Sequence, residues 1–387
     1  MYQIKTMNKI SPAGLARLEP ERFSVSGDCA QPEGILVRSA SLHETPLPEG
    51  LLAVARAGAG VNNIPVDACS AAGVVVFNTP GANANAVKEL VLAGLVLAGR
   101  RVVQGAAWAK TLAGQPDLGK LVEKGKGDFA GPELAGKTLG VVGLGAIGAR
   151  VANMAVHLGM DVLGYDPYIS VDGAWSLSRS VRHCLDLREL LAQCDYLTLH
   201  LPVTADTKEL LNEAALAACK PGVRILNFAR AELVDTAALL AALDAGQAAA
   251  YVTDFACEAL LAQENCVCLP HLGASTPESE DNCAVMAADE LRDYLCNGNI
   301  VNSVNFPNLA MPRTGGARVC VIHKNVPGML AVITDAAGKA KVNIENLTNK
   351  SKGAYAYTVL DAAGPVPEDL AGAIRALPDI VRVRLLP

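Results

Sequence analysis

Three polar side chains follow short apolar runs in the second half of the chain, and together they suit one kind of reaction. Arg230 follows GVRILNF, Glu258 comes shortly after AYVTDF, and His271 follows NCVCLP. An arginine can grip a carboxylate and the adjacent carbonyl, and a histidine can accept or return a hydroxyl proton. A carboxylate bonded to the second imidazole nitrogen would fix the tautomer. These types predict chemistry on a small 2-hydroxy or 2-keto acid, the alternative being a core histidine and a solvated arginine.

A glycine-rich segment supplies a second candidate site. Gly143, Gly145 and Gly148 form a GxGxxG pattern between the apolar run 138–142 and a helical pattern over 146–157. Such glycines permit a tight turn and a close approach of backbone to a pyrophosphate at a helix N-terminus. Asp166 lies about 20 residues on, where a carboxylate accepts the ribose hydroxyls and repels a 2′-phosphate. The pattern predicts a dinucleotide site that favours NAD over NADP.

Two further polar residues lie at predicted strand ends. His200, in HLPVTADT, is either part of a loop that covers the cofactor or a histidine with its bonds satisfied in the core. Asp254 is expected to face the nicotinamide, with an ordinary turn or cap as the alternative. Ligands of open parallel sheets gather outside the carboxyl ends of the strands, so both positions belong to the predicted crevice.

The elements that must position these residues are predicted from alternating apolar and alanine-rich runs. One series has strands near 34–39, 51–56 and 73–78, followed by a helix over 83–100. A second has strands at 138–144, 161–166, 194–201, 222–228, 250–255 and 265–270, with helices at 146–157, 186–192 and 236–245. This alternation predicts an α/β protein with two doubly wound parallel sheets.

The last part of the chain has a different pattern. Residues 306–316, rich in proline and glycine, are predicted to be a linker. From 317 to 387 the order of runs is strand, helix, strand, strand, helix, strand, which is typical of a ferredoxin-like domain.

Composition limits the classes of function. The chain of 387 residues carries 33 basic and 39 acidic side chains, a net charge of −6, so we expect neither nucleic-acid nor membrane binding. The eleven cysteines contain no CxxC pair, and no cluster has metal-ligand spacing, so we expect reduced thiols and no metal. The N-terminus lacks a signal-like apolar run, which predicts a cytoplasmic location.

The motifs ILVRSA, RAGAGVNNI, FNTPGANANAVKEL, GKTLGVVGLGAIG, NFARAELVD, TDFACE, PHLGAST and VNFP appear in an order that resembles the D-2-hydroxyacid dehydrogenases, in the form that carries a C-terminal ACT domain. The resemblance implies a discontinuous substrate-binding domain (1–95 and 281–305), an NAD domain (96–280) and an ACT domain (317–387). It implies Arg230, Glu258 and His271 as the catalytic residues. Its implied NAD contacts are Ala146, Ile147, Asp166, Phe228, Ala229 and Asp254.

The resemblance also implies a substrate and partners. Arg38, Arg56 and the backbone at Gly58 would hold the anionic end of 3-phospho-D-glycerate during its oxidation with NAD to 3-phosphooxypyruvate. The alternative is another D-2-hydroxyacid dehydrogenase, a reductase of glyoxylate, hydroxypyruvate or 2-oxoglutarate, or one acting on glycerate. Lys137 is either a surface lysine or one that reaches a neighbouring subunit's substrate. The implied assembly is a homodimer or homotetramer. In it His323, Asn325 and Asn343 would bind L-serine, the alternative being an ACT domain that only dimerises.

Three positions depart from the family pattern. The glutamate follows the aspartate of TDFACE by four residues where five are common, Asn62-Asn63 replaces the usual Asp-Asn, and Ala231-Glu232 stands where two glycines are frequent. None of these changes removes a charge that the expected chemistry requires.

Overall fold

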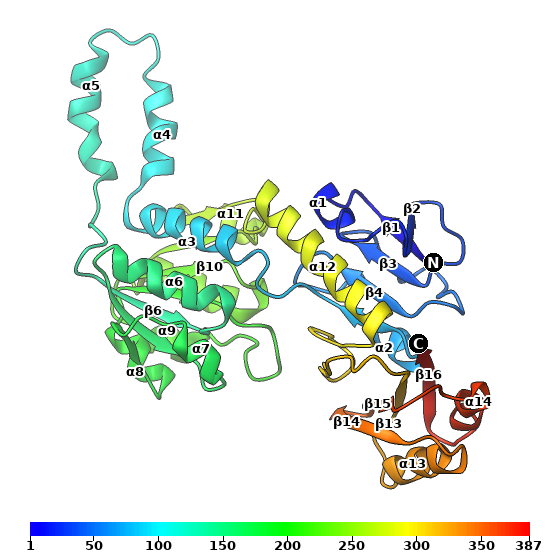
Figure 1. Ribbon diagram of the computed structural model, residues 1–387. Helices are drawn as coiled ribbons and strands as arrows, with labels where there is room; N and C mark the ends of the chain where they lie inside the picture. Colours follow the sequence, from blue (N-terminus) through cyan, green and yellow to red (C-terminus); the bar gives the residue numbers. More distant parts are fainter. The chain divides into compact units, whose positions relative to one another are not determined.

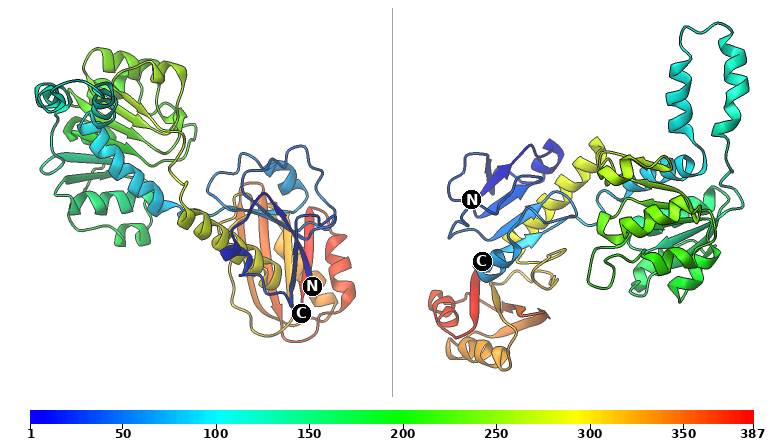
Figure 2. Two further views of the ribbon diagram at one scale, coloured as in Figure 1. Left: turned by 90° about the horizontal axis from the view of Figure 1, so that it is seen from above. Right: turned by 180° about the vertical axis from the view of Figure 1, so that it is seen from behind.

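The chain folds into two compact units. The computed structural model describes all 387 residues except the side chain of Glu368. Unit 1 comprises Met1–Asn83 and Pro277–Pro387, and unit 2 comprises Ala84–Thr276 (Figures 1 and 2). Both contain a parallel sheet, so the predicted α/β class is confirmed.

Unit 1 begins with a five-stranded parallel sheet in the order β2-β1-β3-β4-β5, which is a flavodoxin-like order. The sequence patterns predicted three of these strands and missed the first two. The strands are β1 (Tyr2–Met7), β2 (Phe23–Ser26), β3 (Gly34–Val37), β4 (Ala53–Arg56) and β5 (Val75–Phe77), with the short helices α1 (Pro12–Leu15) and α2 (Val66–Ala71).

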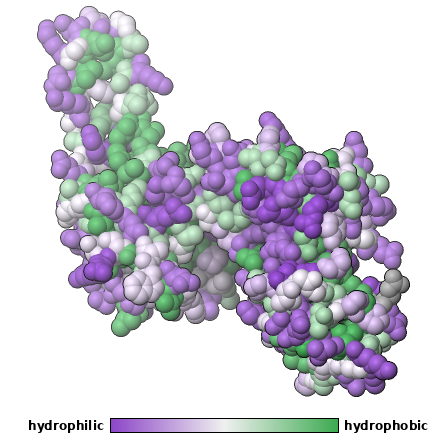
Figure 3. Space-filling model, in the orientation of Figure 1, coloured by the Kyte–Doolittle hydropathy of each residue, from purple (hydrophilic) through white to green (hydrophobic). Residues whose placement is uncertain are grey.

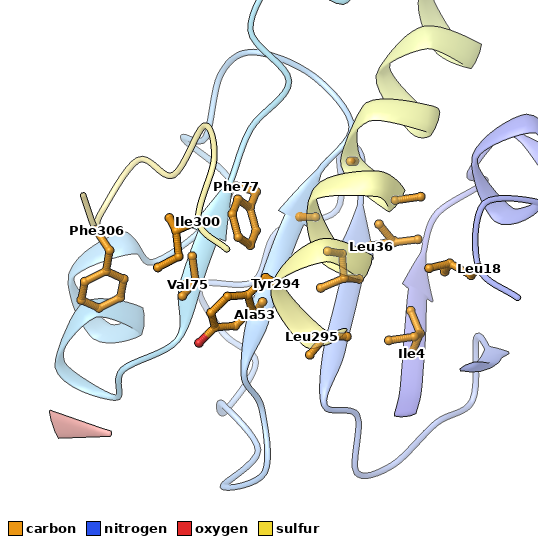
Figure 4. Close-up of a cluster of buried hydrophobic side chains, with 14 of the residues drawn as sticks. Ile4, Leu18, Leu36, Ala53, Val75, Phe77, Tyr294, Leu295, Ile300 and Phe306 are labelled. Carbon is orange, nitrogen blue, oxygen red and sulfur yellow. The ribbon is translucent and has the colours of Figure 1, made fainter. Parts of the chain in front are cut away.

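Helix α12 (Pro277–Asn297) covers this sheet, although it lies about two hundred residues later in the chain. Its buried face includes Leu291, Tyr294 and Leu295, which share one core cluster with Ile4 and Phe77 of the strands (Figure 4). Burial of large apolar side chains is worth roughly 1.5–3 kcal/mol each, so this contact holds the late helix to the early sheet.

Unit 2 contains a seven-stranded parallel sheet in the order β12-β11-β10-β9-β6-β7-β8. One core cluster lies under α3 and α6, and another lies under α8, α9 and α10, so helices cover both faces, as Figure 2 shows. The strand β8 was not predicted. The elements are β6 (Thr138–Val142), α6 (Ala146–His157), β7 (Asp161–Tyr165), α7 (Val171–Trp175), β8 (Val181–His183), α8 (Leu187–Gln193), β9 (Tyr196–Leu199), α9 (Glu213–Ala218), β10 (Val223–Asn227), η2 (Ala231–Leu233), α10 (Thr236–Asp244), β11 (Ala248–Thr253), α11 (Glu258–Leu261) and β12 (Cys266–Cys268).

The first boundary between the units lies before α3 (Ala84–Gly99), whereas the sequence placed it after residue 95. Val87, Val91 and Leu95 of this helix are buried in the core of unit 2 with Leu139 and Val141 of β6. Since a helix belongs to the core that its apolar face enters, α3 is part of unit 2. The return boundary lies at 276/277 where the sequence placed it at 280/281.

A pair of helices projects from unit 2 (Figure 1). They are α4 (Val102–Thr111) and α5 (Leu118–Gly125), followed by the single turn η1 (Lys126–Phe129), and none of their residues is buried. Apolar side chains nonetheless gather on the projection, as Figure 3 shows, including the exposed Val102, Val103 and Leu118. No single helix among the described residues is long and apolar enough to cross a membrane, although α3 and α4 pass that test together as a pair bent by 67°.

The C-terminal part of unit 1 has the predicted ferredoxin-like order. It consists of β13 (Arg318–Lys324), α13 (Met329–Lys339), β14 (Ile344–Lys352), β15 (Tyr355–Ala362), α14 (Glu368–Arg375) and β16 (Ile380–Leu386), in an antiparallel sheet ordered β14-β15-β13-β16. The predicted linker is not a loose tether, because Phe306, Leu309 and Met311 are buried in the same core as α12. Apolar residues spaced between the prolines account for this packing.

Two buried arginines attach this sheet to the end of α12. Arg318 forms a two-pronged ion pair with Asp361 and donates to the carbonyl oxygen of Asn297 at 2.8 Å. Arg384 donates to the carbonyls of Tyr294 and Leu295 and lies 4.6 Å from the centre of the Tyr294 ring. Guanidinium groups at a helix C-terminus satisfy carbonyls that lack intrahelical partners and oppose the helix dipole.

Candidate active site

The glycine-rich loop lies at the point where the strand order of unit 2 reverses. β6 pairs with β7 on one side and β9 on the other, and its carboxyl end leads into the loop and α6. Gly143 has φ of +90°, and a Cβ there would lie 2.5 Å from the carbonyl oxygen of His200. A Cβ on Gly148 would lie 1.8 Å from the carbonyl of Gly143, whereas one on Gly145 would meet nothing within 4 Å. The outer two glycines therefore pack the turn, and Gly145 leaves room for a ligand at the helix N-terminus.

Asp166 follows β7 and ties this loop down. Its Oδ2 accepts from the backbone N–H of Leu144 at 2.8 Å, and its Oδ1 accepts from that of Tyr168 at 2.9 Å. A carboxylate has further lone pairs, so it can still accept from ligand hydroxyls. A cavity of about 630 Å³ opens beside it, lined by Leu144, Gly145, Ala146, Ala149, Arg150, Asn153, Asp166, Tyr168, Ile169, Ser170, Gly173 and Ser176.

Arg230 stands on a turn that Asn227 holds from beneath. The buried Oδ1 of Asn227 accepts from the backbone N–H groups of Ala229 and Arg230, and its Nδ2 donates to the carbonyl of Arg230 and to the hydroxyl of Tyr251. Arg230 itself is exposed and uses Nη1 to bond the carbonyl of Ala229. The sequence reasoning missed Asn227, and the signal was a polar residue at the end of a strand, directly after the apolar pair Ile225 and Leu226.

His271 lies beside Asp254 at the same edge of the sheet. Its backbone N–H bonds the carbonyl of Asp254 at 3.1 Å, and its ring packs edge-on against Phe255 with centroids 5.1 Å apart. Its φ of 51° is a left-handed conformation, which is uncommon for a histidine and is held by these contacts. Burial raises the pKa of Asp254, while the charges of His271 and Arg230 oppose that rise. The three side chains therefore share one electrostatic environment.

The predicted bond between Glu258 and His271 is absent among the described contacts. Glu258 is exposed at the first position of α11, and none of the ion pairs among the described residues includes it. The loop from Asp254 to Glu258 has only three intervening residues, and the backbone N–H of the first, Phe255, donates to the hydroxyl of Thr253 at 3.1 Å. Phe255, instead of Glu258, is the side chain that contacts the His271 ring.

Unit 2 is similar to a known protein domain. A model of the family described as D-isomer specific 2-hydroxyacid dehydrogenase, NAD binding domain, matches residues 93–273. Residues 93–273 are therefore similar to the NAD-binding domain of that family.

Relatives extend the similarity beyond this domain. The D-3-phosphoglycerate dehydrogenase of Rattus norvegicus is 39% identical over 287 residues, which are 72% of this chain and 51% of that protein. The enzyme of that name from Mycobacterium tuberculosis is 36% identical over 332 residues, covering 81% and 60% of the two chains. The chain thus spans about half the length of the curated relatives it matches.

Solved structures of the 2-hydroxyacid dehydrogenase type share the fold. An NAD⁺-bound 3-phosphoglycerate dehydrogenase from Entamoeba histolytica superimposes with a TM-score of 0.62 at 26% identity, covering 80% of this chain and 99% of that one. An NADPH-dependent glyoxylate/hydroxypyruvate reductase from Sinorhizobium meliloti gives 0.64 at 25% identity, covering 79% and 98%.

The residues present fit the cofactor of this family. The open backbone at Gly145 and the N-terminus of α6 suit a pyrophosphate, and Asp166 suits the adenosine ribose. Asp254 is 3% exposed, and its Oδ1 has no hydrogen-bond partner among the described residues. This oxygen can therefore accept a hydrogen bond from the carboxamide N–H of the nicotinamide. Exposed Ala146 and half-buried Ile147 are the first residues of α6, and half-buried Ala229 follows β10. Phe228 differs, because its ring is packed in the core against Gly94.

His200 and Lys137 lie at opposite ends of the strands in the seven-stranded sheet of unit 2. His200 lies at the carboxyl end and Lys137 at the amino end. Half-buried His200 follows β9, and its Nε2 bonds the hydroxyl of Thr198 while Nδ1 has no described partner. Burial lowers the pKa of His200 to about 3, so the ring stays neutral and cannot serve as a base that becomes charged near pH 7. Lys137 immediately precedes β6, at the edge away from the glycine loop, where its charge helps to lower the pKa of Asp195.

The predicted substrate residues of unit 1 lie together after β3 and β4. Arg38 bonds Glu280 of α12 at 2.6 Å, and Arg56 Nε donates to the carbonyl of Arg38 at 3.0 Å. Gly58 has φ of +149°, and a Cβ there would lie 1.9 Å from Arg56 Nη1. The guanidinium of Arg56 therefore crosses the Gly58 backbone, a position only glycine allows.

The three residues predicted to bind L-serine do not lie together within one chain. His323 is 2% exposed, with its nitrogens bonded to the carbonyl of Lys324 and the hydroxyl of Thr358. Asn325 follows β13 beside Tyr355, whereas Asn343 precedes β14 near Ala362, at the other end of β15. Tyr355 and Ala362 are seven residue steps apart along β15, which corresponds to roughly 24 Å. A ligand touching both would require two copies of the chain.

The described residues contain no group of three His, Cys, Asp or Glu side chains arranged to hold a metal ion. All eleven cysteines have free thiols in the structure.

Proposed function

We propose that this chain oxidises 3-phospho-D-glycerate to 3-phosphooxypyruvate with NAD. The observation that carries the proposal is the placement of His271 and Arg230 around the buried Asp254, at the sheet edge that also bears the glycine-rich loop. The relatives at 36–39% identity that bear the name D-3-phosphoglycerate dehydrogenase support the choice of substrate.

Each side chain has a role in this proposal. Arg230 binds the carboxylate and the oxygen at carbon 2, since its guanidinium is exposed and only Nη1 bonds within the chain. The imidazole of His271 accepts the proton of the hydroxyl, and Glu258 stabilises the resulting charge from a distance. The cofactor, when bound, supplies the hydride acceptor. Arg38 and Arg56 bind the phosphate, with the backbone N–H groups near Gly58.

Another 2-hydroxy acid is the competing substrate, and one contact favours it. Arg38 already bonds Glu280, so a bound phosphate must share or displace that carboxylate, whereas a smaller acid without phosphate need not. The two proposed substrates thus differ in whether Arg38 must leave or share its ion pair with Glu280.

The test is the initial rate of NADH formation with 3-phospho-D-glycerate, D-glycerate and D-lactate as substrates, and of NADH consumption with glyoxylate, hydroxypyruvate and 2-oxoglutarate. We expect the largest kcat/KM for the phosphorylated acid. We also expect Arg38→Ala to lower that value far more than the value for D-glycerate. A larger kcat/KM for D-glycerate, or for any of the keto acids, would replace the proposed substrate.

Assembly and regulation belong to the same proposal. We infer a homodimer or homotetramer in which the exposed apolar side chains of α4 and α5 contact a second copy, and in which L-serine binds between C-terminal domains. Light scattering of the wild type against a Val102→Asp, Val103→Asp double variant tests the contact. The NADH assay with and without L-serine tests the effector. The free thiols support a reducing, cytoplasmic compartment as part of this proposal.

A further inference from the structure

A buried acid in unit 1 has no part in the chemistry described above. Glu290, in the middle of α12, is 8% exposed. Its Oε1 accepts from Nδ2 of Asn302 at 2.7 Å, and its Oε2 is buried with no partner among the described residues. A carboxyl group is costly to bury without bonds on both oxygens, so its retention here calls for a reason.

The bond from Glu290 begins a chain of contacts that ends at the substrate loop. Asn302 has φ of 59°, and its carbonyl accepts from the backbone N–H of Asn78 at 3.3 Å. Asn78 in turn donates from Nδ2 to the carbonyl of Ala59 at 2.6 Å. The next residue, Thr79, donates from its N–H to the carbonyl of Gly58 at 3.1 Å. Two adjacent carbonyls of the loop after Arg56 are thus held from one side.

We propose that Glu290 is a positioning residue that sets the backbone of the Arg56–Ala59 loop through Asn302 and Asn78. The inference deepens the proposed function, on which it rests, because this loop is the one assigned to the substrate's anionic end. A small displacement of a ligand-binding backbone is enough to change affinity strongly.

The charged groups around Glu290 do not compensate its charge. Its neighbour Asp289 disfavours ionisation and is itself paired with Arg17 and Arg292. Of the strands that α12 contacts, β3 and β5 carry no charged residue and β4 carries only Arg56 at its end. Burial accordingly raises the pKa of Glu290 to about 8. The acceptor for Asn302 is therefore mainly a neutral carboxyl group near pH 7 and becomes a carboxylate above pH 8.

Three variants test the proposal. Glu290→Gln keeps an acceptor for Asn302, Glu290→Leu removes it, and Asn302→Gly removes the donor while tolerating the positive φ. Glu278→Gln, an exposed acid on the same helix, is the matched control. We expect the Leu and Gly variants to raise KM for the acid substrate roughly ten- to a hundredfold, with kcat and KM for NAD nearly unchanged. The Gln variant should stay near the wild type but lose any bend of KM against pH near 8.

Amide hydrogen exchange gives a readout that needs no turnover. We expect the N–H groups of Asn78 and Thr79 to exchange faster in the Leu and Gly variants, with exchange in β3 unchanged. Unaltered exchange at Asn78 and Thr79, or an unaltered KM in Asn302→Gly, would overturn the role of Glu290. If exchange changes while the wild type oxidises none of the acids tested, the proposed function fails and the positioning role stands. If the Leu variant does not fold, the Gly variant supplies both measurements.

Discussion

Arg230 of unit 2 differs from two arginines of the C-terminal sheet, Arg318 and Arg384, in burial and in the use of its N–H groups. Arg230 follows a strand of unit 2, is exposed, and makes one side-chain bond to its own neighbour. Arg318 and Arg384 lie within strands of the C-terminal sheet, are buried, and donate to several carbonyls around the end of α12. The difference teaches that an arginine is available to a ligand only if the fold leaves its N–H groups unused.

The same contrast applies to histidines. His271 is exposed and held by its backbone, so its ring nitrogens remain available for proton transfer. His323 is buried and uses both nitrogens within the C-terminal domain. We therefore expect substitutions of the exposed Arg230 and His271 to lower the catalytic rate without unfolding the protein. We expect substitutions of the buried Arg318, Arg384 and His323 to lower the free energy of unfolding.

The largest effect is expected at His271. Its replacement by asparagine, which tolerates the positive φ, should lower kcat by roughly 10²–10⁴-fold because the proposed general base is lost. NADH binding, followed by fluorescence titration, should be nearly unchanged, and so should the urea midpoint of unfolding. His183→Asn, at an exposed histidine of β8, is the control. A His271→Asn variant that keeps its turnover would place the base elsewhere and break the comparison.

Arg318 should show the reverse behaviour. Arg318→Met leaves Asp361 buried without its partner, and the loss of one member of a buried pair costs about 3–5 kcal/mol of unfolding free energy. Urea denaturation followed by circular dichroism measures this change. Adding Asp361→Leu should recover part of the loss, whereas Lys339→Ala at an exposed pair should cost less than about 0.5 kcal/mol. A small loss in Arg318→Met would mean that this arginine, like Arg230, is dispensable to the fold.

Glu290 extends the comparison of buried and exposed charged groups, because its burial should make the unfolding free energy depend on pH. Its pKa is about 8 in the folded chain and ordinary, near 4.5, when unfolded, so the folded state binds the extra proton between these values. Stability from this group is therefore full below pH 4.5 and is lost as pH rises to 8, by up to about 1.4 kcal/mol per pH unit. The difference in unfolding free energy between Glu290→Gln and the wild type should grow across that window. A constant difference would show that the folded pKa is not raised.

The smallest effect is expected at Asp166. Asp166→Ala should raise KM for NAD by about tenfold and narrow the preference for NAD over NADP, since the ribose acceptor and the repulsion of a 2′-phosphate are both removed. The measurement is kcat/KM with each cofactor. Asp172→Ala, at a nearby acid in the first turn of α7, controls for the change in net charge. Equal preference in Asp166→Ala and the control would remove Asp166 from cofactor selection.

Much of unit 2 was predictable from the sequence because the strand and helix patterns and the glycine motif depend on neighbouring residues. Helix α6 occupies the predicted residues 146–157, and the glycine loop lies between the predicted strand and helix. The predicted Glu258–His271 hydrogen bond is absent, and the His271 ring packs against Phe255 of the same loop, a tertiary contact that the local sequence pattern does not specify. Asn227 was missed because its bonds to residues two and three positions on, and to Tyr251, depend on the turn itself.

The sequence by itself determined the α/β class, much of the alternation of strands and helices after residue 34 and the residues of the glycine loop, since strand and helix periods and a GxGxxG turn are properties of neighbouring residues. Only the tertiary structure decided which charged side chains are buried or already bonded within the fold. α12 meets strands about two hundred residues away and buries Glu290 between them, and β13 turns Arg318 toward the same helix. Burial depends on contacts between distant segments, and burial decides whether a charge binds a ligand or holds the fold together.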